Sequence, residues 1–197
     1  RIPKITKHYD LQNIFNCDET GLFYQAMPDK SFAVNKECCK GGKTPKDRIS
    51  ILFCVNTTDE EKLKPLVIGK SFEPRCFINL NIRKLSVHLY ANKTTWMNLK
   101  IFNKWLLNLN TSMKQQNMKI ILFMDHASCH PTDIALSNIE LIFFSPNPTS
   151  KLQLLGQSIM RTFKTYYRKH GVKYIISRCA STQTIDEIKI TPLDAIH

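Results

Sequence analysis

Long apolar runs and a nucleotide-binding glycine loop are both missing from this sequence of 197 residues. No stretch reaches the roughly 18 apolar residues that a membrane-spanning helix needs, and Arg1 is not followed by a signal peptide. The segment KGGK lacks the GxxxxGK[ST] spacing of a P-loop. We therefore expect no membrane association. Because the first residue is Arg1 and not methionine, we also expect a fragment or an excised domain.

A cysteine framework is missing as well. The seven cysteines are odd in number, and several lie inside apolar runs such as NCDET and ILFCVN. This pattern favours reduced thiols in a cytosolic or nuclear protein. A zinc site could use His126, Cys129 and His130, but no paired CxxC supplies the remaining ligands. The sequence therefore favours free thiols over a zinc site.

Acidic residues are in short supply. The chain has 16 Asp and Glu against 28 Lys and Arg, which gives a net charge of +12 and a pI of about 9.4. Such a charge favours a polyanionic partner. The hydrophobic fraction of 43%, with 11 Phe and 6 Tyr, is typical of a packed globule. The length allows one core and an insertion rather than two full domains.

Apolar and β-branched runs alternate with helical patterns, which predicts an α/β protein. Strands are expected over residues 13–17, 48–56, 63–69, 119–125 and 138–144. Residues 57–62 are predicted to form the turn between the second and third strands, and residues 71–92 to form loops with short strands. Asp125 stands at the carboxyl end of a fully apolar strand, where open α/β sheets bind their ligands.

Two long helices are predicted. Thr94 or Thr95 can cap the first, in which apolar residues recur every four positions: Met97, Ile101, Trp105, Leu109 and Met113. A short helix is expected near Pro131. The second long helix follows the loop at residues 145–150, and its apolar face comprises Leu152, Gly156, Ile159, Phe163 and Tyr166.

Arg161, Lys164 and Arg168 fall on the opposite side of that second helix, as expected of a solvated face or of a row of phosphate contacts. Gly156 is unexpected on the apolar face, because glycine costs ~1 kcal/mol relative to alanine in a helix interior. Close approach to the sheet or loss of a former side chain would explain it.

Four motifs carry a family resemblance: CDETGLFY (residues 17–24), EKLKPLVIGKSFEPRCF (61–77), LFMDHASCHP (122–131) and PTSKLQLLGQSIMRTFKTYYRK (148–169). In this order they resemble the DDE endonuclease domain of pogo/Tigger transposases, a group that includes jerky-like and centromere-protein-B-like proteins. The resemblance covers residues 13–173. It implies an RNase-H-like fold, with a mixed central sheet flanked by helices, over residues 1–173. Residues 174–197 are expected to form a helical or capping segment.

The resemblance also implies a catalytic site of three carboxylates that hold Mg²⁺ or Mn²⁺. Two cations ~3.5–4 Å apart activate the attacking oxygen and stabilise the leaving one, and carboxylates suit such hard ions. Asp18 matches the first family carboxylate and Asp125 the second. The third falls in a motif close to LQPLDQG, which reads LQLLGQS here, so Gly156 replaces the acid.

No neighbouring residue is a good substitute for the third acid. Glu19 follows Asp18 on a strand and is expected on the other face. Asp133 lies in a different segment, and Gln153 or Gln157 could offer only a neutral oxygen. We expect cation binding to be weakened and strand cleavage to be slight or absent, because the charge stabilisation of the second metal is lost.

Other residues complete the predicted site. His130 matches a family histidine with a structural role behind the metal ligands. His126 stands where the family has asparagine, and a structural role is favoured over contact with a metal or phosphate. The basic loop suggests contacts to the DNA backbone from Lys40, Lys43, Lys46 and Arg48, and the second long helix suggests the same for Arg161, Lys164 and Arg168.

Two functions therefore stand. One is a non-catalytic DNA-binding or interaction domain, either domesticated from a transposon or the remnant of a decayed one. The other is an active metal-dependent DNA endonuclease and strand-transferase. Gly156 favours the first. Either function implies a nuclear protein that contacts DNA mainly at the backbone, without helix-turn-helix modules in this chain. The sequence leaves the oligomeric state open, a homo-oligomer included.

Overall fold

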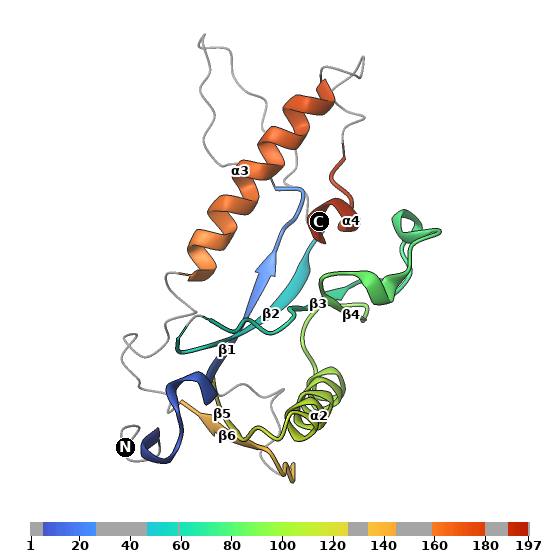
Figure 1. Cartoon of the computed structure of the whole chain (residues 1–197). Helices are drawn as coiled ribbons and strands as arrows, with labels where there is room; N and C mark the ends of the chain where they lie inside the picture. The colour runs from blue at the N-terminus through green and yellow to red at the C-terminus, as the bar shows by residue number, and fades with distance from the viewer. Residues whose placement is uncertain are drawn as a thin grey trace.

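The computed structural model describes residues 6–26, 47–58, 60–125, 134–144, 159–179 and 189–196. A six-stranded mixed sheet forms its centre, in the order β4-β3-β2-β1-β5-β6 (Figure 1). The strands are β1 (Ile14–Leu22), β2 (Ile49–Asn56), β3 (Leu66–Gly69), β4 (His88–Ala91), β5 (Ile120–Met124) and β6 (Ile139–Phe143). The pairs β1–β2 and β2–β3 are antiparallel. The pairs β3–β4, β1–β5 and β5–β6 are parallel.

The predicted strands are confirmed, although the third begins at Leu66 rather than Leu63. Two further differences concern the first and last strands. The first continues beyond Cys17 to Leu22, because the polar residues from Asp18 to Gly21 pair along their whole length with β2. The strand at 138–144 is less buried than expected: only Ile139 is fully buried in β6, which lies at the edge of the sheet. In contrast, all five residues of β5 are buried, as its apolar sequence predicts.

Helix α2 (Leu99–Gln115) covers one face of the sheet. Its buried residues Ile101, Trp105, Leu109 and Met113 have the predicted spacing of four. The predicted cap is wrong, because the N-cap is Asn98, whose side chain accepts a hydrogen bond from the Ile101 amide at 2.9 Å. Thr95 instead adopts a left-handed backbone with φ of 59°, and Thr94 belongs to the turn before the helix.

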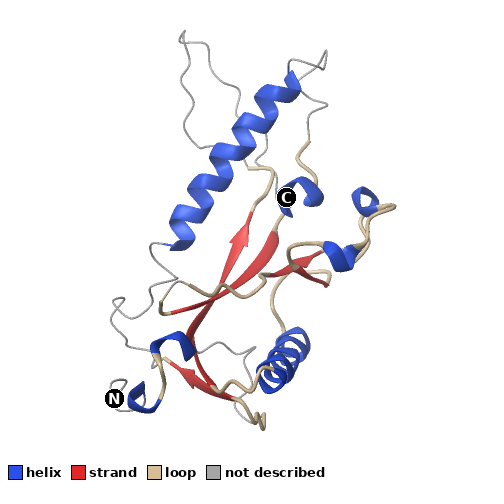
Figure 2. Cartoon of the chain, in the orientation of Figure 1, coloured by secondary structure: helices blue, strands red, loops and turns tan. Residues whose placement is uncertain are grey.

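Helix α3 (Met160–Cys179) and the short α4 (Pro192–Ile196) pack on the other face. Figures 1 and 2 show α3 lying alongside β1 and β2 and pointing the same way as β1. α3 runs past residue 173 to Cys179, so the proposed division at that residue falls within one helix. Beyond it, Ile190 is buried against α3, and the Asp194 carboxylate accepts a hydrogen bond from the Thr191 amide at 2.8 Å.

The remaining described elements are short. Four 3₁₀ turns lie at Thr6–His8, Leu11–Asn13, Arg75–Phe77 and Ile82–Lys84. No helix within the described ranges is long and apolar enough to span a membrane.

Cys17, Cys54 and Cys76 are free thiols, as expected. Cys17 and Cys54 face each other across β1 and β2. Burial, and then the hydrogen bond with Cys54, raise the pKa of the Cys17 thiol.

Candidate active site and nucleic-acid cleft

The two predicted carboxylates come together at the junction of β1 and β5. The last registered pair of these parallel strands is Cys17 with Met124, so Asp18 and Asp125 are the next residues on the two strands. Neighbouring strands lie about 4.8 Å apart. Cys17 and Met124 both point into the core under α2, and side chains alternate along a strand. Asp18 and Asp125 therefore project together from the opposite face, which carries α3.

The electrostatics of Asp18 reflect this position. Burial raises the pKa of Asp18 to about 6, and the negative charge of Asp125 contributes in the same direction. Two interactions lower the pKa of Asp18. The backbone amide of Glu19 donates a hydrogen bond to Asp18 Oδ1 at 2.8 Å, and the positive charge of Lys164 acts in the same direction. The two acids are thus near enough to repel each other, which is the condition under which a cation would be attracted.

A cleft of about 390 Å³ lies between β1 and α3. Its β1 side is formed by Asp18, Glu19 and Thr20, and its α3 side by Met160, Arg161, Lys164, Thr165 and Arg168. Glu19 thus borders the cleft, although it was expected on the other face of the strand. The predicted cationic row therefore does not lie on the side away from the sheet, because its three side chains line the cleft that holds Asp18. The cationic side chains of α3 could bind phosphates of a nucleic-acid backbone in this cleft, next to the Asp18 carboxylate.

The apolar face of α3 differs from the predicted one. Tyr166 is 59% exposed, and Ile159 is 43% exposed. Met160 is buried instead, and Tyr167 packs inward with its hydroxyl donating to the Tyr24 carbonyl oxygen at 2.9 Å. Phe163 is inward as predicted. The helix is rotated relative to the prediction because its sequence carries two competing apolar stripes, and contact with the sheet selects one.

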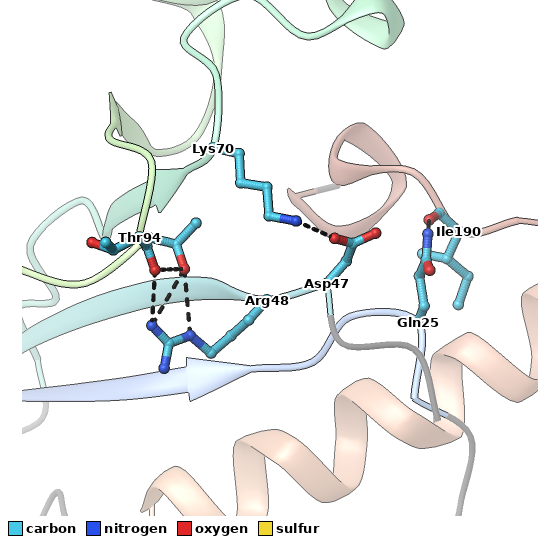
Figure 3. Close-up of polar contacts among 7 residues, drawn as sticks. Gln25, Asp47, Arg48, Lys70, Thr94 and Ile190 are labelled. Atoms are coloured by element: carbon cyan, nitrogen blue, oxygen red, sulfur yellow. Dashed lines mark hydrogen bonds and ion pairs between the residues drawn. The ribbon is translucent and has the colours of Figure 1, made fainter. Parts of the chain in front are cut away.

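Arg48 lies at the start of β2 and does not line the cleft. Its guanidinium donates to the Thr94 carbonyl and the Thr95 hydroxyl, at 3.3 Å each (Figure 3). It also stacks on the Trp96 ring. The other basic-loop residues, Lys40, Lys43 and Lys46, lie outside the described residues.

The third family position also lies outside the described residues. Gly156 belongs to this group, with His126, Cys129, His130, Pro131, Asp133, Gln153 and Gln157. In the part of the chain that is described, no three His, Cys, Asp or Glu side chains gather closely enough to hold a metal ion. Asp18 and Asp125 offer oxygen ligands of the kind that Mg²⁺ prefers, but only as a pair.

Sequence reasoning missed three cleft residues. Thr20 shares a strand face with Asp18 at a spacing of two. Met160 precedes Lys164 by four positions, and Thr165 follows Arg161 by four, so each pair shares a helix face. These periodicities could have identified them once the orientation of α3 was known.

The fold and the carboxylate pair together define the class. A mixed sheet with antiparallel β1–β2–β3 and parallel β5, with two acids on neighbouring strands under a helix, is the core of an RNase-H-like fold. The sequence model of the "DDE superfamily endonuclease" family matches residues 46–197. The chain belongs to this family.

Sequence similarity to known proteins supports the same family assignment. Mouse Tigger transposable element-derived protein 4 is 34% identical over 196 residues, which are 100% of this chain and 38% of that protein. CENP-B homolog protein 2 of Schizosaccharomyces pombe is 32% identical over 188 residues, 89% of this chain and 35% of that one. The chain thus spans little more than a third of these relatives. It is a transposase-derived DDE-domain protein related to the Tigger and CENP-B proteins.

A solved structure supports the fold alone. The Mos1 transposase paired-end complex with the left transposon end superposes with a TM-score of 0.50 at 12% identity, covering 94% of this chain and 53% of that chain. Asp18 precedes the residues matched by the family model. It lies within the alignment to the Tigger protein, which covers the whole chain.

Proposed function

We propose that this domain binds the DNA backbone in the cleft between β1 and α3 and that it cuts DNA poorly or not at all. The observation that carries the proposal is the shared cleft, in which Arg161, Lys164 and Arg168 line the wall facing Asp18. A row of cations at helical spacing matches a phosphate backbone and attracts it without reading sequence. The net charge of +12 acts in the same direction.

The carboxylate pair would supply the metal ligands. Asp18 and Asp125 would hold Mg²⁺ or Mn²⁺ through their oxygens, and a bound cation would stabilise charge on a scissile phosphate. Gly156 brings no ligand atom to the third family position. Lys164 already places a positive charge beside Asp18 and lowers the pKa of that carboxyl. Two carboxylates beside a cationic wall favour phosphate binding over tight retention of two metal ions.

The relatives agree with a DNA-associated role. The Mos1 structure is of a transposase bound to a transposon end, and a further S. pombe relative, 28% identical over 188 residues, is named ARS-binding protein 1. We extend DNA association to this chain and place the protein in the nucleus on that ground.

The second candidate function is a metal-dependent DNA endonuclease and strand-transferase. One observation supports it: Asp18 and Asp125 follow the last registered pair of β1 and β5, so two of the three family carboxylates lie on neighbouring strands. This candidate requires another group to replace the missing acid.

Nicking of supercoiled plasmid in Mg²⁺ or Mn²⁺ separates the two functions. The parent chain is compared with Gly156→Asp and Asp18→Ala. We expect no nicking by the parent and a gain in Gly156→Asp that a second change, Asp18→Ala, abolishes. Parent activity that disappears in Asp18→Ala would establish the endonuclease instead.

Calorimetric titration with Mn²⁺ complements the nicking assay, because it reads the site without turnover. Gly156→Asp should bind Mn²⁺ more tightly than the parent does. Equal affinity in the two proteins would mean that position 156 does not reach the metal site.

A further inference from the structure

The side chain of Trp96 is exposed and yet firmly held. It is 61% exposed, whereas the other tryptophan, Trp105, is buried in the core. The Arg48 guanidinium carbon lies 3.6 Å from the centroid of the Trp96 ring. This cation–π contact orients the indole and gives its stack a positive charge.

The turn before α2 fixes the backbone of Trp96. The Asn92 amide donates to the Trp96 carbonyl oxygen at 2.6 Å, and the Trp96 amide donates to the Thr94 hydroxyl at 3.4 Å. Arg48 reaches the Thr94 carbonyl and the Thr95 hydroxyl from β2 (Figure 3). An exposed ring held from two separate segments loses little freedom when it binds a flat partner.

The same turn contains backbone strain. Thr95 has φ of 59° and is only 3% exposed. A β-branched residue in the left-handed region is an outlier, of a kind that costs about 1–3 kcal/mol and clusters at functional sites. The strained residue keeps its own hydroxyl buried against Arg48, and the next residue presents an indole to solvent.

Trp96 lies near the end of β1, because Arg48 precedes Ile49, the cross-strand partner of Leu22. α2 leads through residues 116–119 into β5, so the start of α2 lies toward the end of β5, where Asp125 stands. Gly21 gives a second link, since a Cβ there would lie 3.0 Å from Arg48 Cδ. Gly21 follows Asp18 by three residues on β1, about 10 Å along the strand. The indole therefore lies beyond the end of β1 that follows Asp18, on the α2 side of the sheet, whereas Asp18 and Asp125 project from the opposite face.

The surrounding chain has no acidic residue. From Pro74 to Met124 there is no Asp or Glu. Over the same span the cations are Arg75, Arg83, Lys84, Lys93, Lys100, Lys104, Lys114 and Lys119. Lys93 and Lys100 flank Trp96 in sequence, and both are exposed. Asp47 precedes Arg48 but is ion-paired with Lys70, so cations remain in excess near the ring. This excess favours a ligand that combines negative charge with an aromatic face, as a nucleotide does.

We propose that Trp96, backed by Arg48, is a stacking site for an unpaired nucleobase of the bound DNA. The inference rests on the proposed DNA binding and adds a preference for single-stranded or locally opened DNA. Stacking on an indole tolerates any base, since every base has a π-face. An acidic protein surface is the competing occupant, and it would need the charge of Arg48 rather than the ring.

The test compares Trp96→Ala, Trp96→Phe and Leu107→Ala in the full 197-residue chain. Leu107 is a matched control, because it is an exposed apolar residue of α2. Fluorescence anisotropy measures binding of labelled oligo(dT) and of a duplex of equal length. We expect Trp96→Ala to weaken oligo(dT) binding about tenfold or more and to change duplex binding less than twofold. Trp96→Phe should recover most of the loss, and Leu107→Ala should match the parent.

Tryptophan emission gives a second readout. Oligo(dT) should quench the parent, whereas Trp96→Phe, which keeps only the buried Trp105, should not respond. Undiminished oligo(dT) binding by Trp96→Ala, or an equal loss for duplex, would overturn the stacking site while leaving DNA binding intact. Displacement of polyglutamate rather than oligo(dT) would identify the acidic partner instead. A parent that binds neither DNA would refute both proposals together.

Discussion

Phe163 of α3 meets Phe53 of β2 edge-on, with ring centroids 4.9 Å apart and planes at 67°. Phe53 is the cross-strand partner of Asp18. This one aromatic contact therefore fixes α3 over the carboxylate pair and brings Lys164, the next residue, within electrostatic reach of Asp18.

Removing this contact should loosen α3. We expect Phe163→Ala to lower the free energy of unfolding by about 3 kcal/mol, near the lower end for a large aromatic because the side chain is only partly buried. Tyr166→Ala on the same helix should change it by less than about 0.5 kcal/mol, since Tyr166 is exposed. Urea denaturation measures both. Equal losses would mean that Tyr166 packs as firmly as Phe163 does, and would contradict the orientation of α3.

Asp18 should make stability depend on pH. Burial raises the pKa of Asp18 to about 6, above its value in the unfolded chain, so the folded state binds the proton more tightly. Stability should therefore fall as the pH rises from about 4 to about 6 and change little above that. Asp18→Asn removes the titration and should gain stability relative to the parent across this window. Denaturation in EDTA at several pH values provides the check, and a parent-to-variant difference independent of pH would contradict it.

Lys164 should contribute one phosphate contact. We expect Lys164→Gln to weaken binding of duplex DNA uniformly across sequences and to reduce the slope of log K against log salt by about 1. Lys114→Gln is the control, because Lys114 lies near the end of α2, which covers the opposite face. Anisotropy titrations from low to moderate salt measure the slopes. If both variants lower the slope equally, the positive charge of Lys164 acts through the net charge of the protein and not through a phosphate contact in the cleft.

The N-cap residue of α2, Asn98, should contribute measurably to the stability of the protein. Asn98→Ala removes the acceptor for the Ile101 amide and should cost about 1 kcal/mol of stability. Asn98→Asp keeps an acceptor and should stay near the parent. Thermal or urea unfolding compares the three proteins. An equal cost in both variants would show that the amide group of Asn98, and not its oxygen, is what matters.

Much of the architecture could be predicted from the sequence. β5 is a continuous apolar run, so its burial and the position of Asp125 at its end follow from composition alone. The spacing of four along α2 likewise fixes its buried face. The face of α3 that packs on the sheet could not be predicted from apolar spacing. Phe163 has helical spacing both with Tyr166 and with the pair Met160 and Tyr167, so the sequence allows two apolar faces.

Local sequence fixed the types of chemistry available to this protein: two aspartates in strand contexts, a glycine at the third family position, and an excess of cations. These depend only on residue identity and short-range periodicity. The tertiary structure decided which groups act together. The parallel register of β1 and β5 aligns Asp18 with Asp125, the packing of Phe163 on Phe53 turns Lys164 into their cleft, and Arg48 reaches Trp96 from a distant strand. Such contacts join residues far apart in the chain, so only the packed sheet and helices could determine them.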